Sequence, residues 1–236
     1  MRIDRFLSHM NVASRKELKV LFKAGRVRVD GTVVKDAKFK VNEATVVYVD
    51  DEPERYQTYF YWLMNKPAGV ISATTDPQKT VLDLLAPADL RDDLFPVGRL
   101  DKDTTGLLLL TNDGDLSHAL LSPKKHVSKV YRATIAGIVT AEDQARFEAG
   151  LVLSDFTAQP AQLEILSVDE AQQESQITVE IHEGKFHQVK RMFHAVGKEV
   201  LTLERLEMGP LALPDDLDRG QYRALTDAEL ALLKAN

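Results

Sequence analysis

The most apolar stretch of the chain is residues 107–110, four consecutive leucines bounded by polar turns. A run this short and this apolar is typical of a strand that is covered on both faces. The tripeptide Asn112-Asp113-Gly114 that follows it is rich in turn-forming residues. The preceding segment, 96–106, is polar, and its glycines at 98 and 106 permit a sharp backbone path. The pattern predicts a tight, charged loop that leads into a buried strand.

The first fifty residues predict two helices and a hairpin. Ser14 and Glu17 form a capping box that begins an amphipathic helix, and a shorter apolar helix covers 3–10. Alternating residues over 27–34 flank the pair Asp30-Gly31, which is the strongest short hairpin signal. This part of the chain is therefore expected to be a small α+β unit.

An acidic, proline-containing stretch follows this unit and predicts a linker. The predicted organisation is a domain over 1–50, a linker over 51–58 and a second domain over 59–236. The aromatic run at 59–64 is either a buried strand or a base-stacking platform. The remaining predicted strands cover 107–110, 128–135, 161–168, 176–181 and 200–206. The remaining predicted helices cover 81–85, 115–121, 140–149, 189–196 and 226–234.

Composition and charge narrow the class of protein. The chain has no cysteine, which excludes disulfides and thiolate metal sites. No stretch approaches the ~18 apolar residues of a membrane span, and no signal peptide is visible, so a cytoplasmic protein is expected. The net charge is −6, but residues 1–40 carry +7 and the remainder carries −13. The basic first unit is either a solvated surface or a phosphate-binding one.

Asp101 has two possible roles in the charged loop. It could accept hydrogen bonds from backbone N–H groups of the turn, or it could be a catalytic carboxylate, because loops on rigid scaffolds often carry function. The motif Gly98-Arg99-Leu100-Asp101-x-Asp103-Thr104-x-Gly106-Leu107-Leu108 resembles the signature loop of the pseudouridine synthases of the RsuA/RluA superfamily. The resemblance implies that Asp101 is the catalytic residue.

Three further motifs resemble the same family. Lys129-x-Tyr131 matches its second motif and implies that Tyr131 stacks on the target base; the alternative is an edge-strand tyrosine. Glu183-Gly184-x-x-His187-Gln188-Val189-Lys190-Arg191 resembles the third motif, whose cation pairs with the catalytic Asp; we assign that cation to Lys190, with Arg191 as the alternative. Asn65-Lys66-Pro67-x-Gly69 resembles a family turn, so Lys66 either borders the cleft or is a solvated turn lysine.

The N-terminal unit resembles the S4 RNA-binding domain. The resemblance rests on Arg2-x-Asp4-x-Phe6-Leu7, Ser14-Arg15 and Gly25-x-Val27-x-Val29-Asp30-Gly31. It implies an RNA-binding surface on this unit, which would position the substrate through backbone phosphates. The residues expected on that surface are Arg2, Arg5, Ser14, Arg15, Lys16 and Arg26.

Together the resemblances imply an α+β chain, with a small S4 domain of two helices and a hairpin. A synthase domain follows, with a mixed, mostly antiparallel sheet and a central cleft. They imply isomerisation of one uridine of 16S rRNA by a monomer, on RNA that is free or in a pre-ribosomal particle, with no cofactor, metal or membrane. A 23S rRNA synthase and a non-catalytic rRNA-binding or ribosome-assembly protein are the alternatives. The expected substrate-binding residues of the cleft are Arg99, Leu100, Lys66, Thr104, Lys129 and Arg191.

Overall fold

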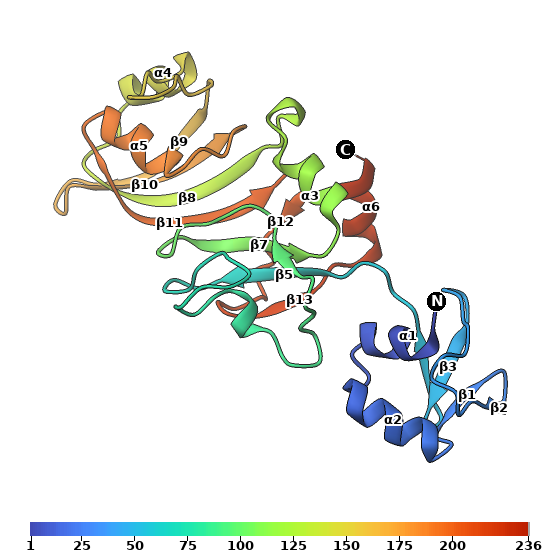
Figure 1. Cartoon of the computed structure of the whole chain (residues 1–236). Coiled ribbons are helices and arrows are strands. Elements are labelled where there is room, and N and C mark those ends of the chain that lie inside the picture. Colours follow the sequence, from blue (N-terminus) through green and yellow to red (C-terminus); the bar gives the residue numbers. More distant parts are fainter. Residues whose placement is uncertain (236) are drawn as a thin grey trace. The chain divides into compact units, whose positions relative to one another are not determined.

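The protein, described here from a computed structural model over residues 1–235, divides into two compact units. The first unit contains Met1–Phe60 and Ala86–Asp93; the second contains Tyr61–Leu85 and the described residues from Leu94 onward. Each unit has its own sheet (Figure 1). No helix within residues 1–235 is both long and apolar enough to cross a membrane.

The first unit packs two helices on a four-stranded antiparallel sheet in the order β2-β1-β3-β4. The elements are α1 (Ile3–His9), α2 (Arg15–Lys23), β1 (Val27–Val29), β2 (Thr32–Val33), β3 (Val46–Val49) and β4 (Glu52–Arg55). The predicted capping box is confirmed: the Ser14 hydroxyl accepts from the Glu17 N–H at 3.3 Å. The predicted hairpin is confirmed too, with both Asp30 and Gly31 at positive φ.

The stretch predicted as a linker contains β4. Asp50 and Asp51 have φ of 52° and 71° and form a two-residue turn that pairs Glu52 with Val49. Asp tolerates the left-handed region better than most residues, so this turn can form without glycine.

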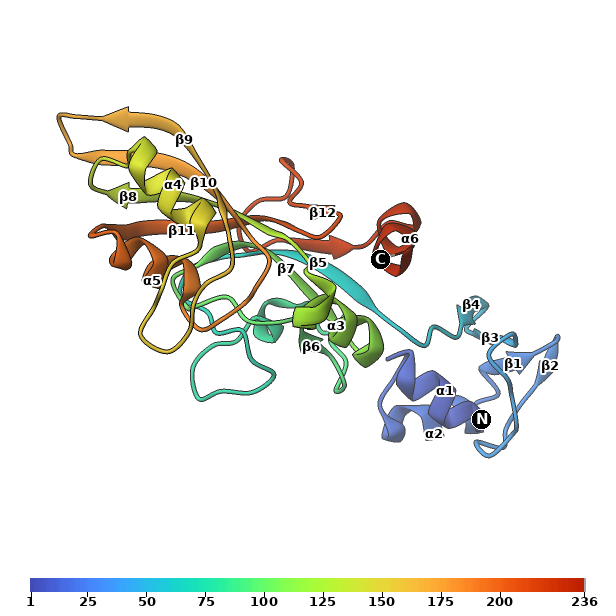
Figure 2. The ribbon, with the colours of Figure 1, turned by 90° about the horizontal axis from the view of Figure 1, so that it is seen from above.

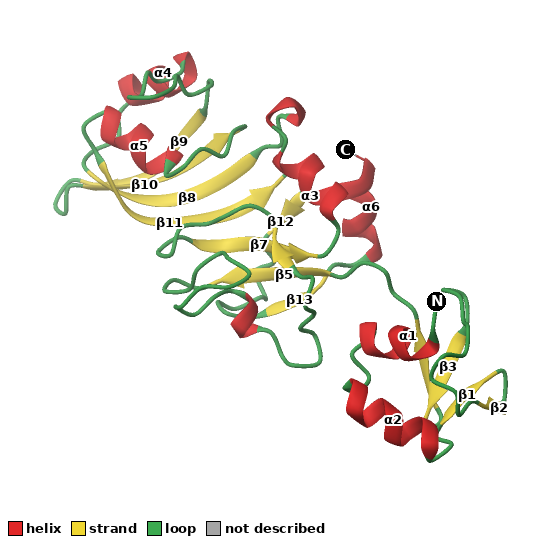
Figure 3. Ribbon diagram, viewed as in Figure 1, coloured by secondary structure: helices red, strands yellow, loops and turns green. Residues whose placement is uncertain are grey.

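The second unit is built on a nine-stranded sheet, which forms a continuous layer in Figure 3. The path is β13-β5-β7-β11-β8-β10-β9, with β6 paired to β7 and β12 paired to β11. All pairs are antiparallel except β7 with β11, so the predicted mixed, mostly antiparallel sheet is confirmed. The strands are β5 (Tyr61–Lys66), β6 (Phe95–Pro96), β7 (Thr105–Thr111), β8 (Lys129–Ala136), β9 (Gln162–Asp169), β10 (Glu174–Ile181), β11 (Glu199–Met208), β12 (Leu211–Ala212) and β13 (Tyr222–Ala224).

The leucine run forms an interior strand of this sheet, β7, between β5 and β11. Every residue of β7 is buried, as the sequence predicts for a strand covered on both faces. The aromatic run forms β5 beside it, but the strand begins two residues later than predicted and continues through Asn65 and Lys66. Helices α4 and α5 lie beside the end of the sheet that carries β9 and β10 (Figures 1 and 2). The helices are α3 (Gly114–Leu121), α4 (Ala141–Ala149), α5 (Gln188–Ala195) and α6 (Asp227–Ala235), with short 3₁₀ turns at Leu82–Leu84 and Pro123–Lys125.

Candidate active site

A buried lysine holds the loop that carries Asp101. Residues 97–104, which we call the Asp101 loop, connect β6 to β7. Lys66 at the end of β5 is fully buried, and its ammonium donates to the backbone oxygens of Asp101 (3.0 Å), Lys102 (3.3 Å) and Thr104 (2.8 Å). Burial lowers the pKa of Lys66 to about 8. Both sequence interpretations of Lys66 placed it at an accessible surface, whereas the structure uses it to fix the loop backbone.

The Asp101 carboxylate faces two basic side chains from the start of α5. Lys190 Nζ lies 3.1 Å from Asp101 Oδ2, and His187 Nε2 lies 3.4 Å from Asp101 Oδ1. Lys190 also bonds Asp103 Oδ1 at 2.7 Å. Within residues 1–235 no backbone N–H donates to the Asp101 carboxylate, so the turn-capping interpretation is not what the structure shows.

The Asp101 and Asp103 carboxylates stabilise the positive charge of Lys190. Burial acts to lower the pKa of Lys190, but hydrogen bonds to Asp103 and Asp101 and the charges of both carboxylates outweigh it and raise that pKa. The hydrogen bond from Lys190 is the main cause of a lowered pKa at Asp103. Lys190 is therefore a stable cation that lies between the Asp101 and Asp103 carboxylates.

A small cavity of about 100 Å³ opens beside this cluster. The Asp101 loop and the start of α5 form one side, and residues of β8, β10 and β11 form the other. Tyr131 lies in β8 and is 8% exposed. Because β8 is paired on both edges, the edge-strand interpretation of Tyr131 is wrong. The cavity-lining residues of the sheet are Lys129, Tyr131, Ile181, Leu203 and Arg205.

The other predicted cleft residues divide into two groups. Arg99, Leu100 and Thr104 line the cavity, and Leu100 is fixed by hydrogen bonds with Ser72. Arg191 does not line it, because its guanidinium pairs with Asp155 and lies over the Phe156 ring. The structure thus brings Lys190, rather than Arg191, to Asp101.

Sequence reasoning missed Arg205, which is 3% exposed and lines the cavity. Arg205 lies two residues after Leu203 in a predicted strand, and residues two apart in a strand lie on the same face of the sheet. This spacing could have indicated that Arg205 faces the same side as Leu203. Sequence reasoning also missed the contact between His187 and Asp101, since only spatial proximity reveals it. Residues 1–235 contain no group of three or more His, Asp or Glu side chains placed to hold a metal ion.

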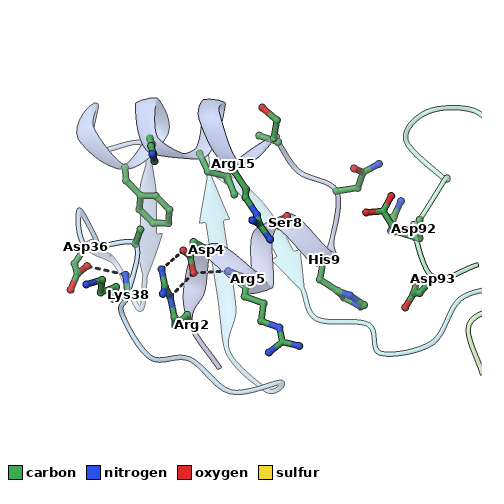
Figure 4. A pocket seen from close by; sticks show the side chains of 18 of the residues that line it. Arg2, Asp4, Arg5, Ser8, His9, Arg15, Asp36, Lys38, Asp92 and Asp93 are labelled. Carbon is green, nitrogen blue, oxygen red and sulfur yellow. Dashed lines mark hydrogen bonds and ion pairs between the residues drawn. The ribbon is translucent and has the colours of Figure 1, made fainter.

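The first unit has a separate polar hollow (Figure 4). Four of the six residues expected on the RNA-binding surface line it, namely Arg2, Arg5, Ser14 and Arg15. Arg2 pairs with Asp4, whereas no carboxylate within residues 1–235 forms an ion pair with Arg5 or Arg15. Lys16 does not line the hollow, and neither does Arg26, which pairs with Asp50.

Comparisons with known proteins match both units. Residues 60–195 match the family described as RNA pseudouridylate synthase, and residues 1–47 match the S4 domain. A solved structure described as that of a pseudouridylate synthase superposes with a TM-score of 0.68 and 34% identity, covering 99% of both chains.

Relatives with different described substrates are similar over nearly their whole length. The Bacillus subtilis protein YtzG, described as an uncharacterized RNA pseudouridine synthase, is 48% identical over 99% of this chain and 98% of its own. Ribosomal small subunit pseudouridine synthase A of Vibrio cholerae is 40% identical over 98% of each chain. Ribosomal large subunit pseudouridine synthase B of Bacillus subtilis is 39% identical over 99% of this chain and 96% of its own.

Proposed function

Because this chain belongs to the RNA pseudouridylate synthase family and carries an S4 domain, we propose that it isomerises one uridine of 16S rRNA, the site the family numbers 516, to pseudouridine. The observation that carries the proposal is the Asp101–Lys190 pair beside the cavity that Tyr131 lines. On this proposal the enzyme acts in the cytoplasm as a monomer, on rRNA that is free or within a pre-ribosomal particle. The similarity to a large subunit synthase supports a second candidate substrate, 23S rRNA.

Each residue of the cavity has a role in this proposal. The target base flips out of the RNA and enters the cavity, where Tyr131 stacks on it. Asp101 either attacks C1′ of the ribose or removes a proton from C2′, and Lys190 and His187 orient its carboxylate. Arg99 is exposed at the cavity edge and holds the RNA backbone where the flipped base has left a gap.

On this proposal the S4 domain supplies affinity for the RNA substrate. Arg5 and Arg15 are basic side chains of the hollow in the first unit, and neither forms an ion pair with a carboxylate of residues 1–235. Such side chains can replace the counterions of RNA phosphates, which gives binding that depends on salt but not on sequence. Selection of the uridine then falls to the second unit, whose cavity is lined by Asp101 and Tyr131.

Pseudouridine mapping of rRNA from cells that lack this protein tests the substrate. We expect one modification to disappear from 16S rRNA relative to the parent strain. Loss of a pseudouridine from 23S rRNA would support the proposed reaction but would replace 16S rRNA with 23S rRNA as the substrate. An unchanged map in both RNAs would contradict the rRNA proposal and favour a non-catalytic role.

Replacing Lys190 with Met tests the orientation of Asp101. The substitution removes charge-assisted hydrogen bonds to Asp101 and Asp103, so we expect single-turnover pseudouridine formation to slow roughly 10- to 100-fold. Arg191→Met is the matched control, because the Arg191 guanidinium pairs with Asp155 instead. Its rate should stay within about threefold of wild type. Equal rates for the two variants would remove the role assigned to Lys190.

A further inference from the structure

Two buried cations lie in the sheet side of the cavity. Lys129 begins β8 and is 6% exposed, and Arg205 in β11 is 3% exposed. Both line the same cavity as Asp101 and Tyr131. A buried cation is costly unless it is paired, so the partners of these two side chains decide what they can do.

Neither cation has a counter-ion among residues 1–235. Lys129 Nζ donates to the Val127 carbonyl at 2.7 Å, and Arg205 Nε donates to the Leu107 carbonyl at 2.9 Å. Arg205 Nη2 is buried and has no acceptor, and no carboxylate of residues 1–235 lies within ion-pair distance of either side chain. Burial first, and then the charge of Arg205, lower the pKa of Lys129 to about 8. The cavity thus contains positive charge that the described protein leaves uncompensated.

The register of the sheet places this charge beside the target base. Arg205 is the cross-strand partner of Tyr131, and paired residues have Cβ atoms only ~4.5–5.5 Å apart. On its other edge Arg205 pairs with Gly106, which has no side chain. A base stacked on Tyr131 would therefore have its edge within reach of the guanidinium.

We infer that Lys129 and Arg205 bind a carbonyl oxygen of the target uracil and stabilise the negative charge that the ring acquires when it leaves the ribose. The inference rests on the proposed function and adds an anion site to it. Lys190 and His187 are the basic side chains that contact Asp101. Lys129 and Arg205 are therefore available to bind the uracil.

The chemistry requires such charge stabilisation. The N1–C1′ bond breaks and its electron pair leaves with uracil, which becomes an anion with charge on N1, O2 and O4. Asp101 meanwhile bonds to C1′ or takes the C2′ proton. After the ring rotates, C5 attacks C1′, Asp101 leaves or returns the proton, and the C5 proton moves to N1. Donors fixed in advance at a developing oxyanion contribute about 10²–10³ in rate each.

Lys129→Met tests the inference with two substrates. The probe is the mapped rRNA fragment with either uridine or 5-fluorouridine at the target position, and the readout is single-turnover cleavage of the N1–C1′ bond. Fluorine stabilises the uracil anion, so the fluorinated base needs less help from the protein. We expect the variant to slow cleavage about 100-fold with uridine and under about tenfold with 5-fluorouridine. Arg205→Met should show the same selective rescue.

Thermal unfolding separates this role from a structural one. Met is similar to Lys in volume and removes an uncompensated buried charge, so the Lys129→Met midpoint should equal or exceed that of wild type. Arg132→Met is the control on the same strand, because Arg132 is exposed and pairs with Glu204. Its cleavage rates with uridine and with 5-fluorouridine should both match those of the wild type.

The outcomes distinguish the inference from the proposed function. An equal slowing of both substrates by Lys129→Met, or no slowing of either, would overturn the anion site while the wild-type enzyme still forms pseudouridine. Failure of the wild-type protein to convert uridine in any rRNA fragment would instead overturn the proposed function.

Discussion

Asp101→Asn is expected to leave RNA binding intact and to reduce pseudouridine formation at least about 1,000-fold, a loss of roughly 4 kcal/mol of transition-state stabilisation. Asn has the shape of Asp but neither attacks C1′ nor accepts the C2′ proton. The Asp101 loop should keep its conformation, because Lys66 holds it through backbone oxygens that the substitution does not change. Single-turnover kinetics and filter binding with the same rRNA fragment measure the two effects separately.

Asp103→Asn is the matched control for this experiment. Asp103 also bonds Lys190, at 2.7 Å, but its side chain is 73% exposed and it does not line the cavity. We expect its rate to fall less than about tenfold, as for the loss of a largely exposed ion pair. Activity of Asp101→Asn within about tenfold of wild type would refute the catalytic assignment.

Much of the fold could be predicted because its signals are local. The buried strand β7, the capping box at Ser14 and the turn at Asp30-Gly31 each depend on residues a few positions apart. Short strands such as β6, β12 and β13 were not predicted. Each has only two or three residues. β6 and β13 exist because strands that are distant in the sequence offer them hydrogen bonds, and β12 pairs with the end of β11 across the turn at Gly209 and Pro210.

The site could be predicted where a motif resembles a family and not where the chemistry depends on packing. The pairing of Lys190 with Asp101 follows from the motif, and the structure places the two groups in contact. The sequence does not distinguish a surface lysine from Lys66, which is buried because the Asp101 loop folds over it. Likewise, the sequence does not distinguish Arg205 from the other arginines, because its place beside Tyr131 depends on the register between β11 and β8.

Gly106 joins the two halves of the large sheet. It pairs with Arg205 in the parallel bridge between β7 and β11, and that bridge connects the strands next to the Asp101 loop with those that carry Tyr131. Its φ is +102°, in a region of backbone conformation that residues other than glycine rarely adopt. A Cβ at this position would lie 2.2 Å from the Arg205 carbonyl oxygen and 2.7 Å from its nitrogen. Because both atoms are backbone, only movement of a strand could relieve the contact.

Gly106→Ala is therefore expected to destabilise the protein by about 4 kcal/mol, since backbone strain and overpacking each contribute about 1–3 kcal/mol. For a chain of this size the thermal midpoint should fall roughly 10 °C. Gly114→Ala is the control, because Gly114 begins α3 and a Cβ there meets nothing within 4 Å. It should change the free energy of unfolding by less than about 1 kcal/mol. Equal stabilities of the two variants in urea would show that β7 and β11 tolerate a side chain at their junction, and the cavity geometry would then not depend on this glycine.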